Sequence, residues 1–405
     1  MNRRGRPCAC PRMGNRKGCP YVYKQMINNE RLIKTLQKLI SYNTTNPPGL
    51  EWDCAKWIEK YMRSLGLDVK TYTYAKRRPN VIATLRGSLP RKQASQGAMC
   101  ITPHFDIVPI GKGWKYDPFG GKIVKGKLYG RGASDDKGNT ASCLEIMHSM
   151  VEDGFKPRHD IIMAATVDEE TGSDYGIIPL LEKRVLKPQV CVVMDSAEYD
   201  AIVAQKGLLH IRIQIFGKKA HGAYNWQGVN AIEQASQIIN QLKQIKFKYK
   251  KHPLLRGPTI NIGTIHGGDK VNMVADFCEF SVDTRYTPDM KFAGIIKLYK
   301  KIIESVTKEY KIIIDDHQLP YQLDPKHRAV SLFLKTAKKM KCPAHLKGSE
   351  GATVVTFFQH HNIPAFATGW AAEGTAHTTD EYIYVKDMCK GTRLLEEYIK
   401  AYDRR

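Results

Sequence analysis

The feature that most constrains this chain is a series of short apolar runs, each followed closely by acidic or imidazole side chains. Runs that are apolar on both faces are typical of central strands in a sheet covered by helices. Ligands of such sheets gather outside the carboxyl ends of the strands. The runs occupy residues 98–102, 161–167 and 190–194, and the polar groups after them are His104 and Asp106, Glu169 and Glu170, and Asp195. The pattern therefore predicts an α/β sheet with a polar centre at one edge.

The order of the expected elements divides the chain. Helices starting near Met26 and at 52–65 and 140–152 combine with the strands in a first part, residues 26–206. The next stretch predicts strand 208–216, helix 228–245, strands 259–265 and 273–284, helix 289–309 and strand 311–315, a βαββαβ unit of ferredoxin-like type. Alternation then resumes with helix 328–340, a helix or loop at 351–361, strand 364–368 and helix 386–402. We therefore expect a mixed, mostly parallel sheet covered by helices, formed by residues 26–206 and 318–405, with an inserted lid and dimerisation domain at 207–317.

Residues 1–25 differ from the rest. They show no periodicity, and we expect a disordered basic tail that is dispensable, with Met26 as the natural start. The ten cysteines of the chain are scattered singly, which is typical of small buried hydrophobes in a reducing compartment. No run approaches the roughly 18 apolar residues of a membrane span. We therefore expect a cytoplasmic protein with no membrane partner.

The formal net charge of +23 raises the alternative of a nucleic-acid-binding protein. Seven of these charges lie in residues 1–25, and much of the rest lies on the helices expected in 238–252 and 291–311. Nucleic-acid binding predicts Lys and Arg interleaved with aromatic residues, which only the tail and residues 246–252 approach. Solvated lysine faces, or a basic funnel for anionic substrates, account for the charge better.

Asp135 and Asp136 are adjacent in LYGRGASDDKG (128–138), behind a glycine-rich bend. Adjacent like charges repel, and burying either one without a cation is expensive. A bound metal ion removes that cost, so the motif indicates a metal site.

His104 and Asp106 are two residues apart in a strand-end segment, so both project to the same side. One can bind metal while the other orients it, because a ligating imidazole needs its second nitrogen tied to an acceptor. Glu169 and Glu170 face opposite ways if the strand stays extended. One can then ligate a metal while the other takes a proton from water that zinc has made acidic, with a pKa near ~7. The alternatives are surface or capping roles for both motifs.

Asp195 and His377 have alternatives too, a strand-end cap and a surface turn. Their joint occurrence with the other groups at strand ends favours a shared site. Two histidines, two aspartates and a glutamate suffice for two metals, each held by one histidine, one terminal carboxylate and one shared carboxylate. That arrangement leaves a bridging position for water.

The sequence resembles the co-catalytic zinc deacylases and peptidases that include succinyl-diaminopimelate desuccinylase, acetylornithine deacetylase, aminoacylase and carboxypeptidase G. The resemblance extends from Met26 to the end through SYNTTNPPG, PHFDIVP, YGRGASDDKG, TVDEETGS, KKAHGAYNWQGVNAI and GTAHTTDE. It implies two Zn²⁺ per chain, and Co²⁺ or Mn²⁺ can replace zinc at mixed N/O sites.

The resemblance also implies roles for individual residues. In one zinc site the ligands are His104 and Asp195, in the other Glu170 and His377, and the bridge is Asp135. The remaining matches are Asp106 to the acid that orients His104, Glu169 to the general base, and the Asp135–Asp136 peptide to the family's cis bond. His221 matches a histidine that reaches a partner subunit's active site and stabilises the oxyanion, which implies a homodimer through the lid.

Arg285 and Asn272 resemble lid residues that contact substrate carboxylate or carbonyl groups, although an exposed strand-end arginine is an alternative. In SEGATVVTFF, Val354 and Thr356 stand where the family's substrate loop has an acid and an arginine, which argues against diaminopimelate-type specificity. Gly351 and Thr353 can still offer backbone or hydroxyl contacts.

We therefore expect hydrolysis of the amide bond of a small N-acyl amino acid, with Glu169 as the general base. A dipeptidase or carboxypeptidase on the same scaffold is the alternative.

Overall fold

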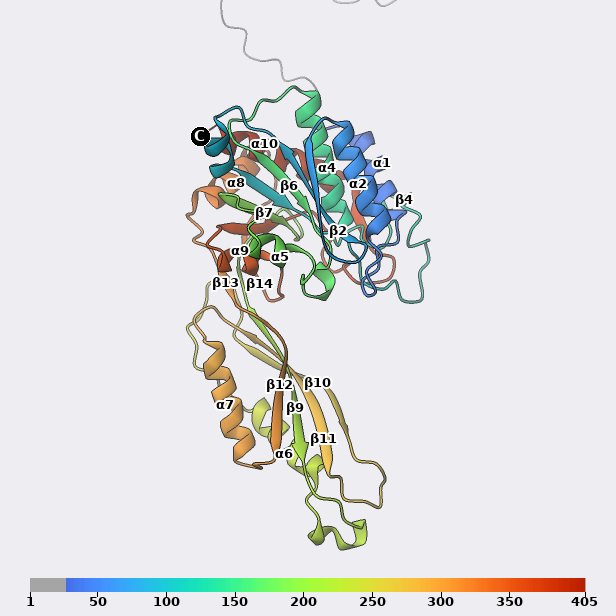
Figure 1. The fold of residues 1–405 in the computed structure, drawn as a ribbon, viewed down its shortest axis with the longest axis vertical. Helices are drawn as coiled ribbons and strands as arrows, with labels where there is room; N and C mark the ends of the chain where they lie inside the picture. The colour runs from blue at the N-terminus through green and yellow to red at the C-terminus, as the bar shows by residue number, and fades with distance from the viewer. Residues whose placement is uncertain (1–26, 405) are drawn as a thin grey trace, which may run out of the picture.

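The computed structural model describes residues 27–404, so the expected tail of residues 1–25 lies outside the described residues. Two lobes follow one another along the long axis of the molecule (Figure 1), and each is built on its own sheet. We call them the body and the lid. The chain enters the lid after residue 205 and returns to the body before residue 321.

The body contains a nine-stranded sheet in which most of the central pairs are parallel. Its order is β1-β2-β6-β3-β7-β15-β8-β13, and β14 pairs with β8. The four strands β6, β3, β7 and β15 run parallel to one another, whereas β1 and β2 pair antiparallel at one edge. The strands are β1 Asp68–Ala75, β2 Arg78–Leu85, β3 Met99–Thr102, β6 Ile161–Ala165, β7 Val190–Met194, β8 Ala201–Gln205, β13 Tyr321–Gln322, β14 Leu346–Ser349 and β15 Ala365–Thr368. A mixed, largely parallel sheet was predicted and is confirmed.

Both faces of this sheet are covered, as the all-apolar strands require. Alternate residues of β7 face opposite ways, Val190 and Val192 into one core cluster and Cys191 and Val193 into another. The first cluster contains residues of α1 (Asn29–Ile40), α2 (Trp52–Ser64), α4 (Lys137–Glu152), α8 (Arg328–Lys339) and α10 (Val385–Asp403). The second contains residues of α5 (Ile177–Glu182) and α9 (Val355–His360).

The remaining body elements are short. They are α3 (Arg91–Gln96) and a small sheet with the order β16-β5-β4, made of β4 (Lys122–Val124), β5 (Lys127–Tyr129) and β16 (Tyr382–Tyr384). The seven cysteines in the described part of the chain are free and buried, as expected of small apolar side chains. Among the described residues, every helix is too short or too polar to cross a membrane.

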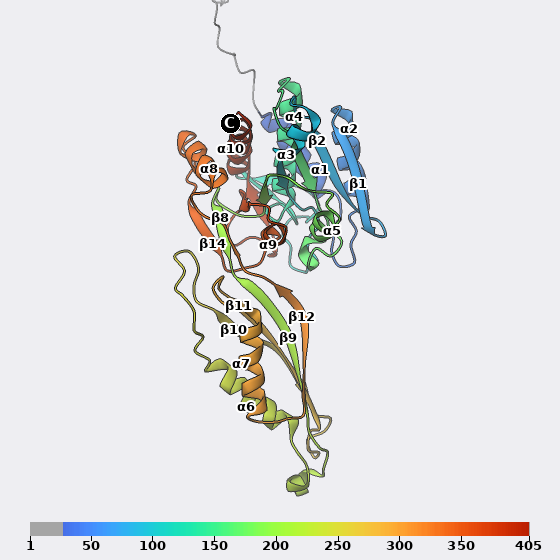
Figure 2. The ribbon, with the colours of Figure 1, turned by 60° about the vertical axis from the view of Figure 1, so that its left-hand side comes forward.

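The lid has the predicted βαββαβ order. Its elements are β9 (Gly207–Phe216), α6 (Ala231–Lys243), β10 (Thr259–Gly267), β11 (Phe277–Tyr286), α7 (Phe292–Glu304) and β12 (Tyr310–Gln318). The strands pair antiparallel in the order β10-β11-β9-β12, and both helices lie on one side of the sheet (Figure 2). Leu209, Ile211 and Ile213 point toward the helices into a core of the lid's own. Separate sheets and cores support the proposed division at residues 207 and 317.

Several boundaries differ from expectation. Residues 273–276 precede β11 instead of belonging to it, and both lid helices are shorter than predicted. The alternating polar pattern of β1 (DVKTYTYA) and the short strands β8, β13 and β14 were not predicted. The strands β1, β13 and β14 lack the continuous apolar run by which central strands are recognised, whereas β8 (AIVAQ) has such a run and was overlooked.

Candidate active site

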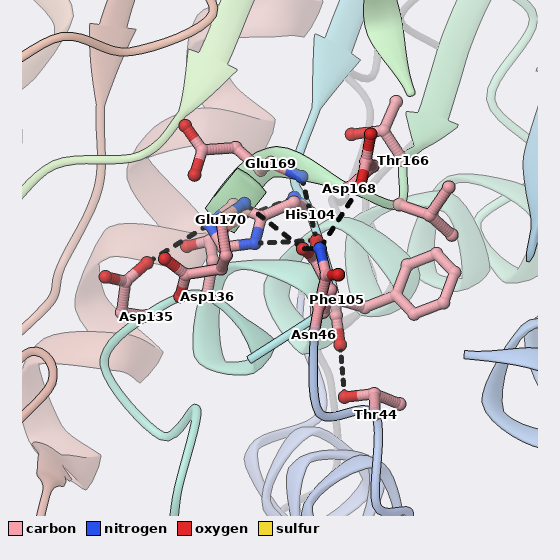
Figure 3. A network of polar contacts seen from close by, with 12 residues as sticks. Thr44, Asn46, His104, Phe105, Asp135, Asp136, Thr166, Asp168, Glu169 and Glu170 are labelled. Atoms are coloured by element: carbon pink, nitrogen blue, oxygen red, sulfur yellow. Dashed lines mark hydrogen bonds and ion pairs between the residues drawn. The ribbon is translucent and has the colours of Figure 1, made fainter. Parts of the chain in front are cut away.

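The carboxyl ends of β6, β3, β7 and β15 meet at one edge of the sheet because these neighbouring strands are parallel. The predicted residues follow those strands directly: His104 after β3, Glu169 and Glu170 after β6, and Asp195 after β7. His377 lies in the turn between β15 and β16, and Asp135 lies just before α4. The topology therefore brings six groups from distant parts of the sequence to one place (Figure 3 shows four of them).

Asp135 is the centre of this group. Its Oδ1 lies 3.1 Å from His104 Nε2, and its Oδ2 lies 3.2 Å from His377 Nε2. His377 Nε2 is also 3.1 Å from Glu170 Oε2. Two sets of possible ligands result, His104 with Asp135 and Asp195, and Asp135 with Glu170 and His377, and the ligand atoms of each set lie within 4.8 Å of one another. Asp135 is the member common to both sets.

Asp136 faces a different set of partners from its neighbour. Its Oδ2 accepts the backbone N–H of His104 at 3.2 Å, and its Oδ1 accepts the side-chain amide of Asn139 at 2.5 Å. The peptide between Asp135 and Asp136 is cis, as the resemblance implied. The two adjacent carboxylates therefore have different contacts, Asp135 with the two histidine rings and Asp136 with the His104 backbone and the Asn139 side chain.

The His104 ring lies against two carboxylates, because its Nδ1 is 3.4 Å from Asp106 Oδ1 while its Nε2 faces Asp135. Asp106 is fully buried and also accepts the backbone N–H groups of Glu169 and Glu170 at 3.2 and 3.1 Å. The side-chain amide of Asn46 donates to Asp106 Oδ2 at 2.9 Å. Asp106 therefore connects the β3 end to the β6 end.

The extended strand expected at Glu169 and Glu170 is wrong. Both residues lie in a 3-10 turn, Glu169–Thr171, which follows Asp168 in a left-handed conformation with φ of 69°. The sequence places three acids after the strand, and their backbone is bent by hydrogen bonds to buried carboxylates such as Asp106. The two glutamates still point apart (Figure 3): Glu170 contacts His377, whereas the Glu169 carboxylate lies away from Glu170.

Electrostatics at this site favour a bound cation. Burial and the neighbouring Asp135 carboxylate raise the pKa of Asp195 to about 7. Burial, together with the charges of Asp195 and Glu170, raises the pKa of Glu169 well above its usual value. Hydrogen bonds to Asp135 and Glu170 raise the pKa of His377 to about 10. So many carboxylates cannot all ionise together unless positive charge is placed among them.

The residues fit a pair of metal ions. Tetrahedral ligand atoms about 2 Å from an ion lie roughly 3.3 Å apart, close to the observed His–carboxylate spacings. Glu170 Oε1 is buried without a hydrogen-bond partner among the described residues, so it remains available to a cation. The mixed imidazole and carboxylate set suits zinc and related divalent ions.

A cleft of about 640 Å³ opens onto this group. It is lined by Asp135, Glu169, Glu170, Asp195 and His377 of the body, by Arg285 of the lid, and by Gly351 and Thr353 of the predicted substrate loop. His221 and Asn272 do not line it. They lie together at the far end of the lid, where the Gly222 N–H donates to the Asn272 carbonyl at 2.8 Å.

One residue that positions the site was missed from the sequence. Glu381 is fully buried and accepts the backbone N–H groups of Gly132, Ser134 and Asp135 at 3.1, 2.8 and 3.0 Å. Its Oε2 also lies 2.8 Å from Arg131 Nη1. Glu381 thus holds the bend that presents Asp135. The signal was present in HTTDEY, four residues after His377, but an acid in a polar turn is easily taken for a surface residue.

Comparisons with known proteins agree with this geometry. The chain belongs to peptidase family M20/M25/M40, whose sequence profile matches residues 100–401. It is 26% identical over 387 residues to an acetylornithine deacetylase of Vibrio cholerae serotype O1, covering 91% of this chain and 98% of the relative.

Two solved structures share the fold. An aminopeptidase PepT from Bacillus cereus has a TM-score of 0.78 at 22% identity, covering 94% of this chain and all of the other. A dinuclear metal-binding M20 peptidase from Bacillus subtilis has a TM-score of 0.70 at 16% identity, covering 91% and 97%. The predicted resemblance is confirmed, and the chain is a metal-dependent hydrolase of this family.

Proposed function

We propose that this protein is a dinuclear metal amidohydrolase that removes the acyl group from a small N-acyl amino acid. Asp135 carries the proposal, because it alone belongs to both ligand sets among the described residues. The relative named acetylornithine deacetylase, aligned over nearly its whole length, supports an acyl group on the substrate nitrogen. The B. subtilis relative, which is described as dinuclear, supports two ions.

In this proposal His104 and Asp195 hold one ion, Glu170 and His377 hold the other, and Asp135 holds both. Zn²⁺ is the expected metal, and Co²⁺ or Mn²⁺ can occupy the same donors. When bound, two such ions polarise the scissile carbonyl and make a water acidic enough to lose a proton near neutral pH.

The protein's own residues then handle the proton and the substrate. Glu169 lines the cleft and, among the described residues, forms no ion pair with His104 or His377, so it is free to accept the proton of the attacking water and return it to the leaving amine. Its raised pKa makes it a more basic carboxylate than usual. Asp106 fixes the orientation of the His104 ring.

Arg285 is the proposed contact for the substrate carboxylate. Its Nε donates to Asp283 at 2.9 Å, which orients the guanidinium, and its side chain lines the cleft. Guanidinium groups bind carboxylates in a bidentate manner. Gly351 and Thr353 line the same cleft and can contact the acyl or amide group.

We further propose a homodimer formed through the lid, in which His221 and Asn272 complete the cleft of the second copy. Large apolar side chains near the lid tip support this: Trp226 is 73% exposed and Val271 fully exposed. Exposed apolar patches of this kind mark interaction surfaces. The buried free cysteines support a reducing, cytoplasmic location.

The test is hydrolysis of a panel of N-acetyl, N-succinyl and N-formyl amino acids and of dipeptides, by the zinc-loaded protein and after chelation. Activity on one acyl class that chelation removes and metal restores would establish the deacylase. Cleavage of dipeptides alone would establish the peptidase alternative, which the PepT-like fold supports. No hydrolysis of any amide by protein with two bound metals would contradict the proposal.

A further inference from the structure

The junction between body and lid contains a pair of buried polar residues that no step above uses. Gln205 is the last residue of β8 and Lys206 is the single residue before β9, and their side chains are 0% and 1% exposed. Burying a lysine is costly unless the charge is paired. The groups that pair with this lysine therefore show which segments the junction connects.

Lys206 binds two segments at once. Its Nζ lies 2.5 Å from Glu350 Oε2 and donates to the Gly257 carbonyl at 2.6 Å. Glu350 in turn accepts the backbone N–H of Arg256 at 2.9 Å through its other oxygen. Burial opposes ionisation of Glu350, but the contacts with Lys206 and Arg256 outweigh it and lower its pKa. Lys206 thus links the β9 entry, the segment before β10 and the start of the loop after β14.

Gln205 holds the other end of that loop. Its Oε1 accepts the backbone N–H and the hydroxyl of Thr353, both at 3.0 Å, and its Nε2 donates to the Thr353 carbonyl at 3.2 Å. The backbone N–H of Lys206 also donates to Ser349 at 3.1 Å. Two consecutive residues therefore fix both ends of the loop 349–353.

This loop belongs to the cleft. Gly351 and Thr353 line it together with the metal-ligand candidates and Arg285. The junction is also where both chain crossings between the lobes meet, because β13 pairs with β8 through Tyr321 and Gln205. A rotation of the lid about this junction would move Lys206 and the loop together.

We propose that Gln205 and Lys206 are positioning residues that hold the substrate loop 349–353 at a fixed position relative to the lid. They thereby fix where Arg285 of the lid lies relative to Gly351 and Thr353 of the body. The consequence for catalysis rests on the proposed amidohydrolase function, whereas the effect on the loop itself does not.

The test compares Lys206→Met and Gln205→Leu, which keep the side-chain volume nearly constant, with Lys206→Arg as the conservative rescue. Lys335→Met, on the exposed face of α8, is the matched control. Two readouts are needed: hydrogen–deuterium exchange of the backbone N–H groups of residues 349–354, and KM and kcat on the best substrate of the panel. Bound metal is measured for each variant.

We expect Lys206→Met and Gln205→Leu to exchange faster in residues 349–354 and to raise KM about 10-fold or more, with kcat changed less and both metals retained. Lys206→Arg should restore most of KM, and Lys335→Met should match the wild type. Loop exchange and KM within twofold of wild type in both variants would overturn the proposal. If Lys206→Met does not fold, Glu350→Gln, which removes the exposed partner of the same ion pair, gives the same comparison.

Amide exchange separates this inference from the proposed function. If the wild type hydrolyses no amide in the panel, the proposed function fails. Faster exchange of residues 349–354 in Lys206→Met would then still support the proposed role of Lys206 in holding the loop, whereas unchanged exchange would contradict that role.

Discussion

Asp106 shows how much of the site depends on residues that need not touch a metal. It is fully buried, and it contacts the His104 ring and the backbone N–H groups of both glutamates. We expect Asp106→Asn to weaken metal binding about 10- to 100-fold, because outer partners of ligating histidines contribute that much. Isothermal titration of the chelator-treated protein with Zn²⁺ measures the change. The exposed Asp324→Asn serves as control, and equal affinity in both variants would contradict the role.

For Glu169 we expect a substitution to change turnover and not metal binding. Glu169→Gln should keep both metals but lower kcat by about 10² to 10⁴-fold, the usual contribution of a general base. Metal analysis of the purified variant, combined with turnover on the best substrate, distinguishes this from loss of a ligand. A variant that loses one metal would show that Glu169 belongs to the ligand set instead.

At the scale of single residues, the sequence indicated which acidic and imidazole side chains gather at the strand ends. The fold brings together His104, Asp135, Glu170, Asp195 and His377, and it places Asp106 beside the His104 ring. What could not be predicted is the local backbone. The turn at Glu169–Thr171 depends on hydrogen bonds to Asp106, which is distant in sequence, and no local pattern reports such a partner.

At the scale of elements, the bend before α4 depends on a distant acid. Glu381 accepts three backbone N–H groups from the bend and pairs with Arg131, with both side chains buried. Glu381→Gln should therefore destabilise the protein by roughly 3 kcal/mol, because Arg131 would keep a buried charge without its partner. Urea unfolding of the metal-free protein measures it.

The matched control is Glu182→Gln, an acid that is exposed at the end of α5. The two variants should differ in stability, and Glu381→Gln should also bind metal more weakly, since Asp135 is displaced with the bend. A stability equal to that of the control would mean that the three N–H contacts hold the bend without the charge.

At the scale of the whole molecule, the proposed dimer makes a prediction about mixtures. His221 lies at the lid tip and does not line the cleft of its own chain. We expect His221→Ala and Glu169→Gln to be inactive alone but to regain activity when mixed and allowed to exchange subunits. In such a heterodimer, one cleft has an intact Glu169 from one chain and an intact His221 from the other.

The test is turnover measured after mixing, with sedimentation to confirm that the protein is a dimer. Wild-type activity in the unmixed His221→Ala protein would contradict a role for this residue. Mixing without recovery, although heterodimers are present, would show that His221 does not act across the interface.

Architecture was predictable where periodicity was strong. The βαββαβ order of the lid follows from alternating strands and amphipathic helices, and it is confirmed. The hinge was not predictable, because the pairing of β8 with β13 and β14 joins segments separated by more than a hundred residues. Gln205 and Lys206 become informative only once those strands are known to be neighbours.

The position of β15 in the sheet has a consequence for protein synthesis. β15 lies between β7 and β8, although it is made after the whole lid, and His377 follows it. Domains generally fold from the amino terminus as the chain leaves the ribosome. A nascent chain therefore has β7 and β8 early, but the strand that lies between them and the last imidazole are both missing until nearly all of the protein has been translated. Hydrolytic activity should appear only in finished chains.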